Sequence, residues 1–247
     1  MESFKQLSDL LVLDIETVPA VPAFTDLDPH WQTLFRNKLA KTVPEGSDPA
    51  DLYRKKAGIL AEFGRIICIS TAFFTREQDP PIGLRIQNIA GHEEVEILRS
   101  FTEVCRRMES AHPGFRFAGH NIREFDIPFI CRRFLALGLS LPASLQFHDK
   151  KPWEIPLFDT MGWWKFGDIK NYVSLDLLAN VLRIPSSKSD MDGSQVQDVY
   201  YRDKNLDRII AYCQQDVITT ARIILRFLAQ PDLPDRAVFL PEGSRPV

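Results

Sequence analysis

The run LLVLDIETVPA near the N-terminus is an apolar stretch that contains two acidic residues. Successive side chains of a β-strand point to opposite faces, so Leu11, Leu13 and Ile15 share one face while Asp14 and Glu16 share the other. Apolar residues on both faces are typical of a strand inside a sheet, where an unpaired charge costs free energy. We therefore expect positive charge against the two carboxylates, or an open strand end at which they lie.

The rest of the chain alternates between predicted strands and helices. β-Branched and aromatic residues predict strands, and apolar residues spaced three and four apart predict helices. The predicted strands cover residues 64–74, 83–91 and 115–121, and the predicted helices cover 93–108, 126–138, 174–184 (with Ser174 as N-cap) and about 205–229. Three strands in succession, followed by strand–helix alternation, predict an α/β fold with a mixed sheet flanked by helices.

One domain accounts for most of the chain. The 247 residues are compatible with a single α/β domain, which we place at residues 1–230. Residues 26–62 carry two helix-like segments and are predicted to form a helical insertion in that domain. The proline-rich residues 231–247 predict an extended C-terminal arm.

The composition argues against several classes of protein. A formal net charge of −3 is not that of a protein that coats nucleic acid non-specifically, although it allows an enzyme that holds a few phosphates through metal ions. No apolar run of about 18 residues is present, so no membrane contact is expected, and the N-terminus lacks the pattern of a secretion signal. The four cysteines are scattered without a CxxC pair, which predicts free thiols in the cytoplasm.

Two further motifs carry acids. In GHNIREFDIPFI, Asp126 lies at the start of a helix that follows a strand and a turn. In YCQQD, Tyr212 and Asp216 are four residues apart, so they share one otherwise apolar face of the last helix. Each motif alone has a structural explanation, because Asp126 suits a helix cap and Tyr212 suits a core. Together with the first strand, however, they place four acids and a tyrosine in a specific order, which indicates a metal site.

The motifs DIET, NIREFD and YCQQD resemble the three exonuclease motifs of the DEDD superfamily of 3′–5′ exonucleases. The tyrosine four residues before the last aspartate marks the DEDDy branch, and Ala211 stands where the other branch has a histidine. GHNIREFDIPFI followed by SLDLLANVL resembles the proofreading exonuclease domain of family-B DNA polymerases. The chain as a whole resembles the stand-alone bacterial exonucleases that are related to this domain. This resemblance implies a ribonuclease-H-like fold, with a mixed five-stranded sheet whose first three strands are antiparallel.

The resemblance also implies a catalytic chemistry. Asp14, Glu16, Asp126 and Asp216 would hold two divalent ions, Mg²⁺ or Mn²⁺, and Asp14 would bridge both. Such ions offset the negative charge of a phosphodiester and lower the pKa of an attacking water. Tyr212 would orient this water rather than take its proton, because a tyrosine with a pKa of about 10 is a poor base at neutral pH. The product would be a 5′-mononucleotide released from a 3′ end.

Four residues are candidate substrate contacts. By the resemblance, Thr17 contacts the terminal nucleotide and Asn121 hydrogen-bonds the backbone of the strand. Phe125 is placed either against a base, where stacking suits sequence-independent binding, or in helix-start packing. Lys188 is placed either against a phosphate or in a solvated loop.

Two residues near the motifs are left outside the predicted metal site. Asp159 in LFDTMGW could act as a fifth acid, but we expect it to cap or brace the segment that follows. His120 lies in the loop beside the second motif, where a single histidine is expected to form hydrogen bonds rather than to bind a metal.

Three functions are compatible with these residues. The first is a metal-dependent 3′–5′ exonuclease acting on single-stranded DNA ends. The second is a 3′–5′ exoribonuclease or oligoribonuclease of the same fold, which would have to accept a 2′-hydroxyl near Thr17. The third is an inactive nucleic-acid-binding module, although the presence of all four acids and the tyrosine argues against a decayed site. The sequence identifies no protein partner.

Overall fold

The computed structural model describes residues 2–44, 46–168, 170–185 and 191–241. The central mixed sheet has the strand order β5-β4-β1-β2-β3-β6. Its strands are β1 (Leu10–Pro19), β2 (Gly64–Arg76), β3 (Ile82–Ala90), β4 (Arg116–Gly119), β5 (Leu157–Asp159) and β6 (Val238–Phe239). The α-helices are α1 (Glu2–Ser8), α2 (Pro29–Leu39), α3 (Pro49–Lys56), α4 (Glu94–Ala111), α5 (Asp126–Ala136), α6 (Thr160–Lys165), α7 (Leu175–Val181), α8 (Val196–Tyr201) and α9 (Leu206–Phe227).

The strand directions agree with the predicted sheet. β1, β2 and β3 are antiparallel to one another in turn, whereas β4, β5 and β6 run parallel to their neighbours. The predicted α/β class is confirmed, as is the antiparallel arrangement of the first three strands. A sixth strand, β6, adds to the five that were predicted. It comes from the proline-rich C-terminal segment, where Val238 pairs with Leu84 and Phe239 with Arg85.

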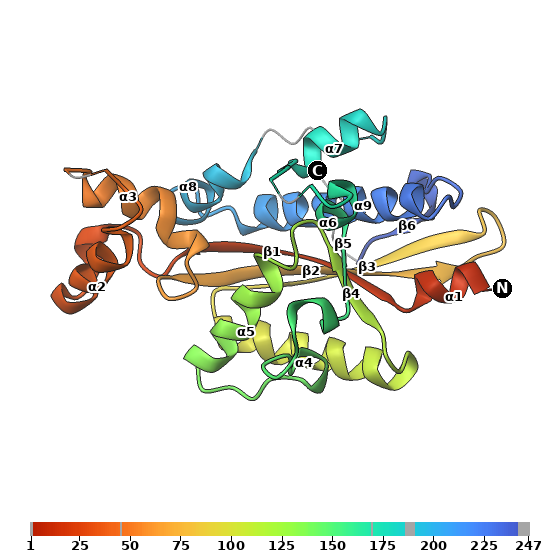
Figure 1. Ribbon diagram of the computed structural model, residues 1–247, viewed down its shortest axis with the longest axis horizontal. Coiled ribbons are helices and arrows are strands. Elements are labelled where there is room, and N and C mark those ends of the chain that lie inside the picture. Colours follow the sequence, from red (N-terminus) through yellow and green to blue (C-terminus); the bar gives the residue numbers. More distant parts are fainter. Residues whose placement is uncertain (1, 45, 169, 186–190, 242–247) are drawn as a thin grey trace.

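Helices cover both faces of the sheet, with α4 and α5 on one face and α9 on the other (Figure 1). Leu11, Leu13 and Ile15 of β1 belong to the core cluster that includes residues of α4 and α5. Leu10 and Val12 of the same strand belong to the cluster that includes residues of α9. The predicted alternation along this strand is therefore confirmed, and the even-numbered acids of β1 lie on the face covered by α9.

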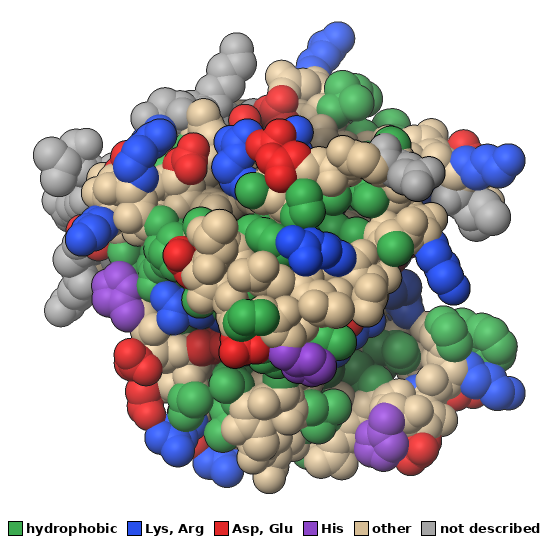
Figure 2. Space-filling model, turned by 90° about the vertical axis from the view of Figure 1, so that its left-hand side faces the viewer, with side chains coloured by type: hydrophobic (Ala, Val, Ile, Leu, Met, Phe, Trp, Pro, Cys, Tyr) green, Lys and Arg blue, Asp and Glu red, His purple; other side chains and the backbone are tan. Residues whose placement is uncertain are grey.

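The segment between β1 and β2 forms α2 and α3 at one end of the sheet, on the left in Figure 1. It has its own small core, in which the ring of Phe35 lies 5.2 Å from that of Tyr53 and 5.1 Å from that of Phe63. Viewed from this end, basic and acidic side chains are interspersed with apolar ones (Figure 2). This view shows no extended basic surface, in agreement with the composition.

The longer predicted helices are present, with ends that differ by a few residues. Ser174 caps α7 as predicted, because its Oγ accepts a hydrogen bond from the Leu177 N–H at 3.2 Å. The sequence pattern did not predict α1, α6 and α8, which are too short for a helical period to be recognised. None of the described helices has the length and apolar character that a bilayer-spanning helix requires.

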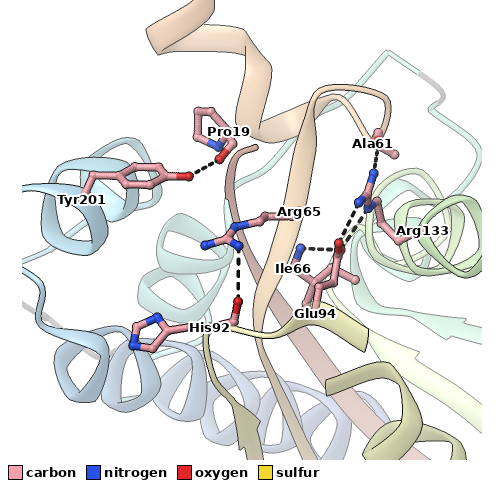
Figure 3. Close-up of polar contacts among 8 residues, drawn as sticks. All are labelled: Pro19, Ala61, Arg65, Ile66, His92, Glu94, Arg133 and Tyr201. Atoms are coloured by element: carbon pink, nitrogen blue, oxygen red, sulfur yellow. Dashed lines mark hydrogen bonds and ion pairs between the residues drawn. The ribbon is translucent and has the colours of Figure 1, made fainter. Parts of the chain in front are cut away.

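A buried ion pair connects α4, α5 and β2 (Figure 3). The Glu94 carboxylate accepts hydrogen bonds from Arg133 Nε at 2.9 Å, Arg133 Nη2 at 2.6 Å and the Ile66 N–H at 2.7 Å. Arg133 also donates to the carbonyl oxygen of Ala61 at 2.9 Å. Because both charges are satisfied by fixed partners, this network holds the start of α4 and the end of α5 against the sheet.

Candidate functional site

The first two acids lie in the middle of the sheet, on β1. Glu16 is buried and Asp14 is half-buried, on the face covered by α9. The ladder between β1 and β2 shifts register between Glu16 and Thr17, as at a β-bulge. Such an irregularity increases the local twist and changes the direction of nearby side chains, and bulges are frequent beside active sites.

The third acid reaches β1 from the start of α5. Asp126 is 3 % exposed, and its Oδ1 accepts a hydrogen bond from the Ile15 N–H at 3.2 Å, between the two acids of β1. Gly119, at the end of β4, makes this approach possible. A Cβ at that position would lie 2.8 Å from the Ile122 Cβ and 3.0 Å from the Leu13 carbonyl oxygen, so a larger residue would push the connecting loop away from β1.

Helix α9 supplies the fourth acid. Tyr212 and Asp216, one turn apart, hydrogen-bond to each other through their side chains. Cys213 lies between them on the buried side of the helix, and its Sγ donates to Asp14 Oδ2 at 3.4 Å. Ligand atoms of Asp14, Glu16 and Cys213 all lie within 4.8 Å of one another. Three elements that are far apart in the sequence thus bring their acids to one place.

The acids raise one another's pKa values. Burial is the largest cause for Asp14, and the charges of Asp126, Glu16 and Asp216 raise its pKa further. Burial and the charge of Asp216 likewise raise the pKa of Glu16, and burial raises that of Asp126 to about 7. Within the described part of the chain, no lysine or arginine forms an ion pair with Asp14, Glu16 or Asp126. A dense, desolvated set of carboxylates fits hard divalent ions, which prefer oxygen ligands.

Comparison with known proteins adds an independent observation. Residues 59–234 match a family model described as "predicted 3'-5' exonuclease related to the exonuclease domain of PolB". The chain belongs to this family. The matched segment contains Asp126, Tyr212 and Asp216 but begins after β1. Asp14 and Glu16 are therefore assigned to the site from their position in the structure and not from the family match.

A solved structure shares the fold of this PolB-related family member. The family B DNA polymerase from the hyperthermophilic archaeon Pyrobaculum calidifontis aligns with a TM-score of 0.54 and 12% sequence identity. The alignment covers 89% of this chain but 24% of the polymerase, so the chain corresponds to about a quarter of that protein. Comparison with curated proteins finds no match.

In this member of the PolB-related family, Asp159 braces the loop before Asp126. Its carboxylate accepts hydrogen bonds from the backbone N–H groups of Asn121 at 3.0 Å, Arg123 at 3.1 Å and Met161 at 3.0 Å. His120 bonds Thr160 Oγ1 and the Val173 carbonyl oxygen, both at 2.9 Å. Both residues are thus engaged in holding the loop, which agrees with their being left outside the predicted metal site.

The four predicted substrate contacts have different structural environments. Thr17 follows the acid pair, but its hydroxyl donates to the Gly58 carbonyl oxygen at 2.7 Å. Asn121 has a left-handed backbone (φ 60°) in the braced loop. Phe125 is half-buried against the core of α5, with its ring 5.6 Å from that of Phe129, so packing accounts for part of its surface. Lys188 lies outside the described residues.

The raised pKa of Asp126 predicts a pH-dependent stability. An acid with a pKa near 7 in the folded protein and 3.8 when unfolded favours folding while it is protonated, so its contribution is lost as pH rises from about 4 to 7. Asp126→Asn keeps an acceptor for Ile15 and removes the titration. In chelating buffer, its melting temperature relative to the wild type should therefore be higher at pH 8 than at pH 5. An equal difference at both pH values, measured by calorimetry, would contradict this assignment.

Proposed function

We propose that this protein is a metal-dependent 3′–5′ exonuclease that hydrolyses phosphodiester bonds at the 3′ ends of single-stranded DNA and releases 5′-mononucleotides. The observation that carries the proposal is the convergence of Asp14, Glu16, Asp126 and Asp216 in one desolvated cluster. Membership in the PolB-related family supports the reaction class. The four free cysteines favour a reducing compartment such as the cytoplasm.

The four carboxylates would hold the ions, which we propose to be two Mg²⁺ or Mn²⁺. Their oxygen atoms suit these hard cations, and the mutual repulsion of the acids falls when positive charge is bound. Bound ions of this kind neutralise a phosphodiester, lower the pKa of an attacking water and stabilise the leaving oxygen. The Cys213 thiol, beside Asp14, is a softer donor that these ions do not favour.

Tyr212 positions the attacking water in this proposal. Burial and the neighbouring charges of Asp216, Glu16 and Asp14 raise the pKa of its hydroxyl, so it stays protonated at working pH. A protonated phenol can donate one hydrogen bond and accept another, but it cannot remove a proton. Its contribution is therefore the orientation of the nucleophile relative to the phosphorus atom.

Replacing Tyr212 by phenylalanine should slow turnover about 10- to 100-fold, because orientation is lost while the acids remain. The increase in melting temperature produced by Mn²⁺ should be retained. Tyr201→Phe is a matched control, since that hydroxyl bonds the Pro19 carbonyl oxygen at 2.6 Å, away from the acid cluster. Unchanged turnover in Tyr212→Phe would remove this residue from the mechanism.

Digestion of end-labelled oligonucleotides tests the proposal directly. DNA and RNA single strands, and duplexes with 3′ or 5′ overhangs, are incubated with Mg²⁺ or Mn²⁺ and with a chelator as control. We expect metal-dependent release of 5′-mononucleotides, with the 3′ overhang shortened faster than the 5′ overhang. The reverse preference would contradict the proposed polarity.

The same experiment separates the other candidate functions. Faster digestion of RNA would favour the exoribonuclease, whose site must accept a 2′-hydroxyl near Thr17. An inactive binding module would release no nucleotide. Its melting temperature would not rise on addition of Mn²⁺, because it would bind no ion.

A further inference from the structure

Three aromatic side chains are unusually exposed near the loop that leads to Asp126. Phe166 is 91% exposed, Trp153 is 76% exposed and Tyr172 is 70% exposed, the highest values among the large hydrophobic residues of the described chain. Scattered exposed apolar residues are ordinary, but exposed aromatic residues on segments that contact the loop leading to Asp126 suggest a surface that binds a ligand.

Phe166 is not explained by the local fold. It ends α6 in a left-handed conformation (φ 43°), a position that glycine or asparagine occupies with less strain. Its side chain buries almost no surface, so packing does not offset this strain. A residue kept in an unfavourable backbone conformation and in full contact with solvent is better explained by a ligand than by stability.

The end of α6 contacts the loop that leads to Asp126. Lys165 Nζ lies 3.6 Å from Glu124 Oε1, and Glu124 is two residues before Asp126. The segment that follows Phe166 is held by the hydrogen bond between His120 and the Val173 carbonyl oxygen. Both contacts connect the Phe166 segment to the loop from which Asp126 reaches β1.

Trp153 lies on a second segment that contacts the same loop. Arg123 donates hydrogen bonds to the carbonyl oxygens of Pro152 and Ile155, on either side of Trp153. Lys151 Nζ is 5.5 Å from the centre of the Trp153 ring. The loop of residues 120–125 is thus in contact with two aromatic segments, and each carries an exposed lysine, Lys151 or Lys170.

We propose that Phe166 and Trp153 are stacking surfaces for bases of the single strand on the 5′ side of the nucleotide that is removed. Aromatic rings bind any base through its face, while lysines attract the phosphates, which is how single strands are held without sequence preference. Phe125 is half-buried against α5 and leaves less of its ring for this role. The inference rests on the proposed function and adds the path by which the strand reaches the acids.

Fluorescence of 2-aminopurine tests this stacking without catalysis. Oligodeoxynucleotides carry the probe at the second or third position from the 3′ end, and the protein carries Asp14→Asn in chelating buffer so that no cleavage occurs. We expect quenching on binding, and an affinity about fivefold or more weaker after Phe166→Ala or Trp153→Ala. Phe166→Tyr keeps a ring and should retain the quenching. Absent quenching in the parent protein, or equal affinity in all variants, would overturn the inference.

Kinetics with substrates of different length provide the second test. The p-nitrophenyl ester of thymidine 5′-monophosphate has no base on the 5′ side, so Phe166→Ala should cleave it at the wild-type rate while its KM for an octanucleotide rises about fivefold or more. Leu135→Ala, which also truncates an exposed apolar side chain (66% exposed, on α5), is the control and should leave the cleavage rate of the ester and the octanucleotide KM unchanged. An unchanged octanucleotide KM in Phe166→Ala, or an equal rise in Leu135→Ala, would overturn the inference. A wild-type protein inactive on both substrates would contradict the proposed function instead, and the fluorescence result would still decide the stacking role.

Discussion

Asp14→Ala should reduce nucleotide release at least about 1000-fold while leaving the fold intact, because it removes a carboxylate from the centre of the acid cluster. In chelating buffer at pH 8, the variant should melt at the same temperature as the wild type or higher. The reason is that burial and three neighbouring acids oppose the charge of Asp14 in the metal-free protein. An ordinary buried polar contact would show the opposite, a loss of stability.

Mn²⁺ provides the complementary measurement. At 100 times its Kd, an ion that binds the folded state alone stabilises by about 2.7 kcal/mol, or about 5–10 °C for a protein of this size. The wild type should show this increase and Asp14→Ala should lose most of it. Asp207→Asn changes an exposed acid on α9, so Mn²⁺ should raise its melting temperature as much as that of the wild type. Full activity of Asp14→Ala, with the Mn²⁺ effect retained, would exclude this residue from the site.

Glu94→Ala should be strongly destabilising although it lies away from the site, with a loss of about 3–5 kcal/mol in the free energy of unfolding. It leaves the Arg133 guanidinium buried without its counter-ion and removes the acceptor of the Ile66 N–H. We expect the melting temperature to fall by about 10 °C or more in calorimetry.

The exposed pair of Glu96 and Arg99, with a nitrogen–oxygen distance of 2.7 Å, is the matched control on the same helix. Glu96→Ala should change the free energy of unfolding by less than about 1 kcal/mol, because water screens such pairs. Glu94→Gln keeps an acceptor for the Ile66 N–H, so its loss in the free energy of unfolding should lie between those of Glu94→Ala and Glu96→Ala. A melting temperature of Glu94→Ala within the error of the control would show that Arg133 finds other partners.

Much of the site could be predicted because its signals are local. The shared orientation of Asp14 and Glu16 follows from the period of a strand, and the shared face of Tyr212 and Asp216 from the period of a helix. That Asp159 caps α6, the segment that follows it, also followed from its place before a helix, whereas its bonds to the preceding loop were not predicted. The convergence of these elements was inferred from the order of the motifs, and the structure brings them together.

Other features depend on packing that the sequence does not reveal. Cys213 is one residue after Tyr212, about 100° around α9, and only the docking of this helix on β1 brings its sulfur to Asp14. Phe166 belongs to an aromatic stretch that local hydrophobicity would assign to a core, yet it is almost fully exposed. β6 was not predicted because two residues carry no periodicity, and its pairing is set by the turn at Leu233 to Ala237.

The two residues of β6 also cover part of the outer edge of the sheet. They pair with the first half of β3, and Leu233 and Ala237 before them are buried on the side of the sheet that α9 covers. A shortened chain that stopped after α9 would uncover apolar surface and lengthen the open edge of β3 by the N–H and C=O groups that now pair with β6. Open edges of that kind recruit strands from other molecules. Such a truncated chain should therefore self-associate in proportion to its concentration, even though every acid of the cluster is still present.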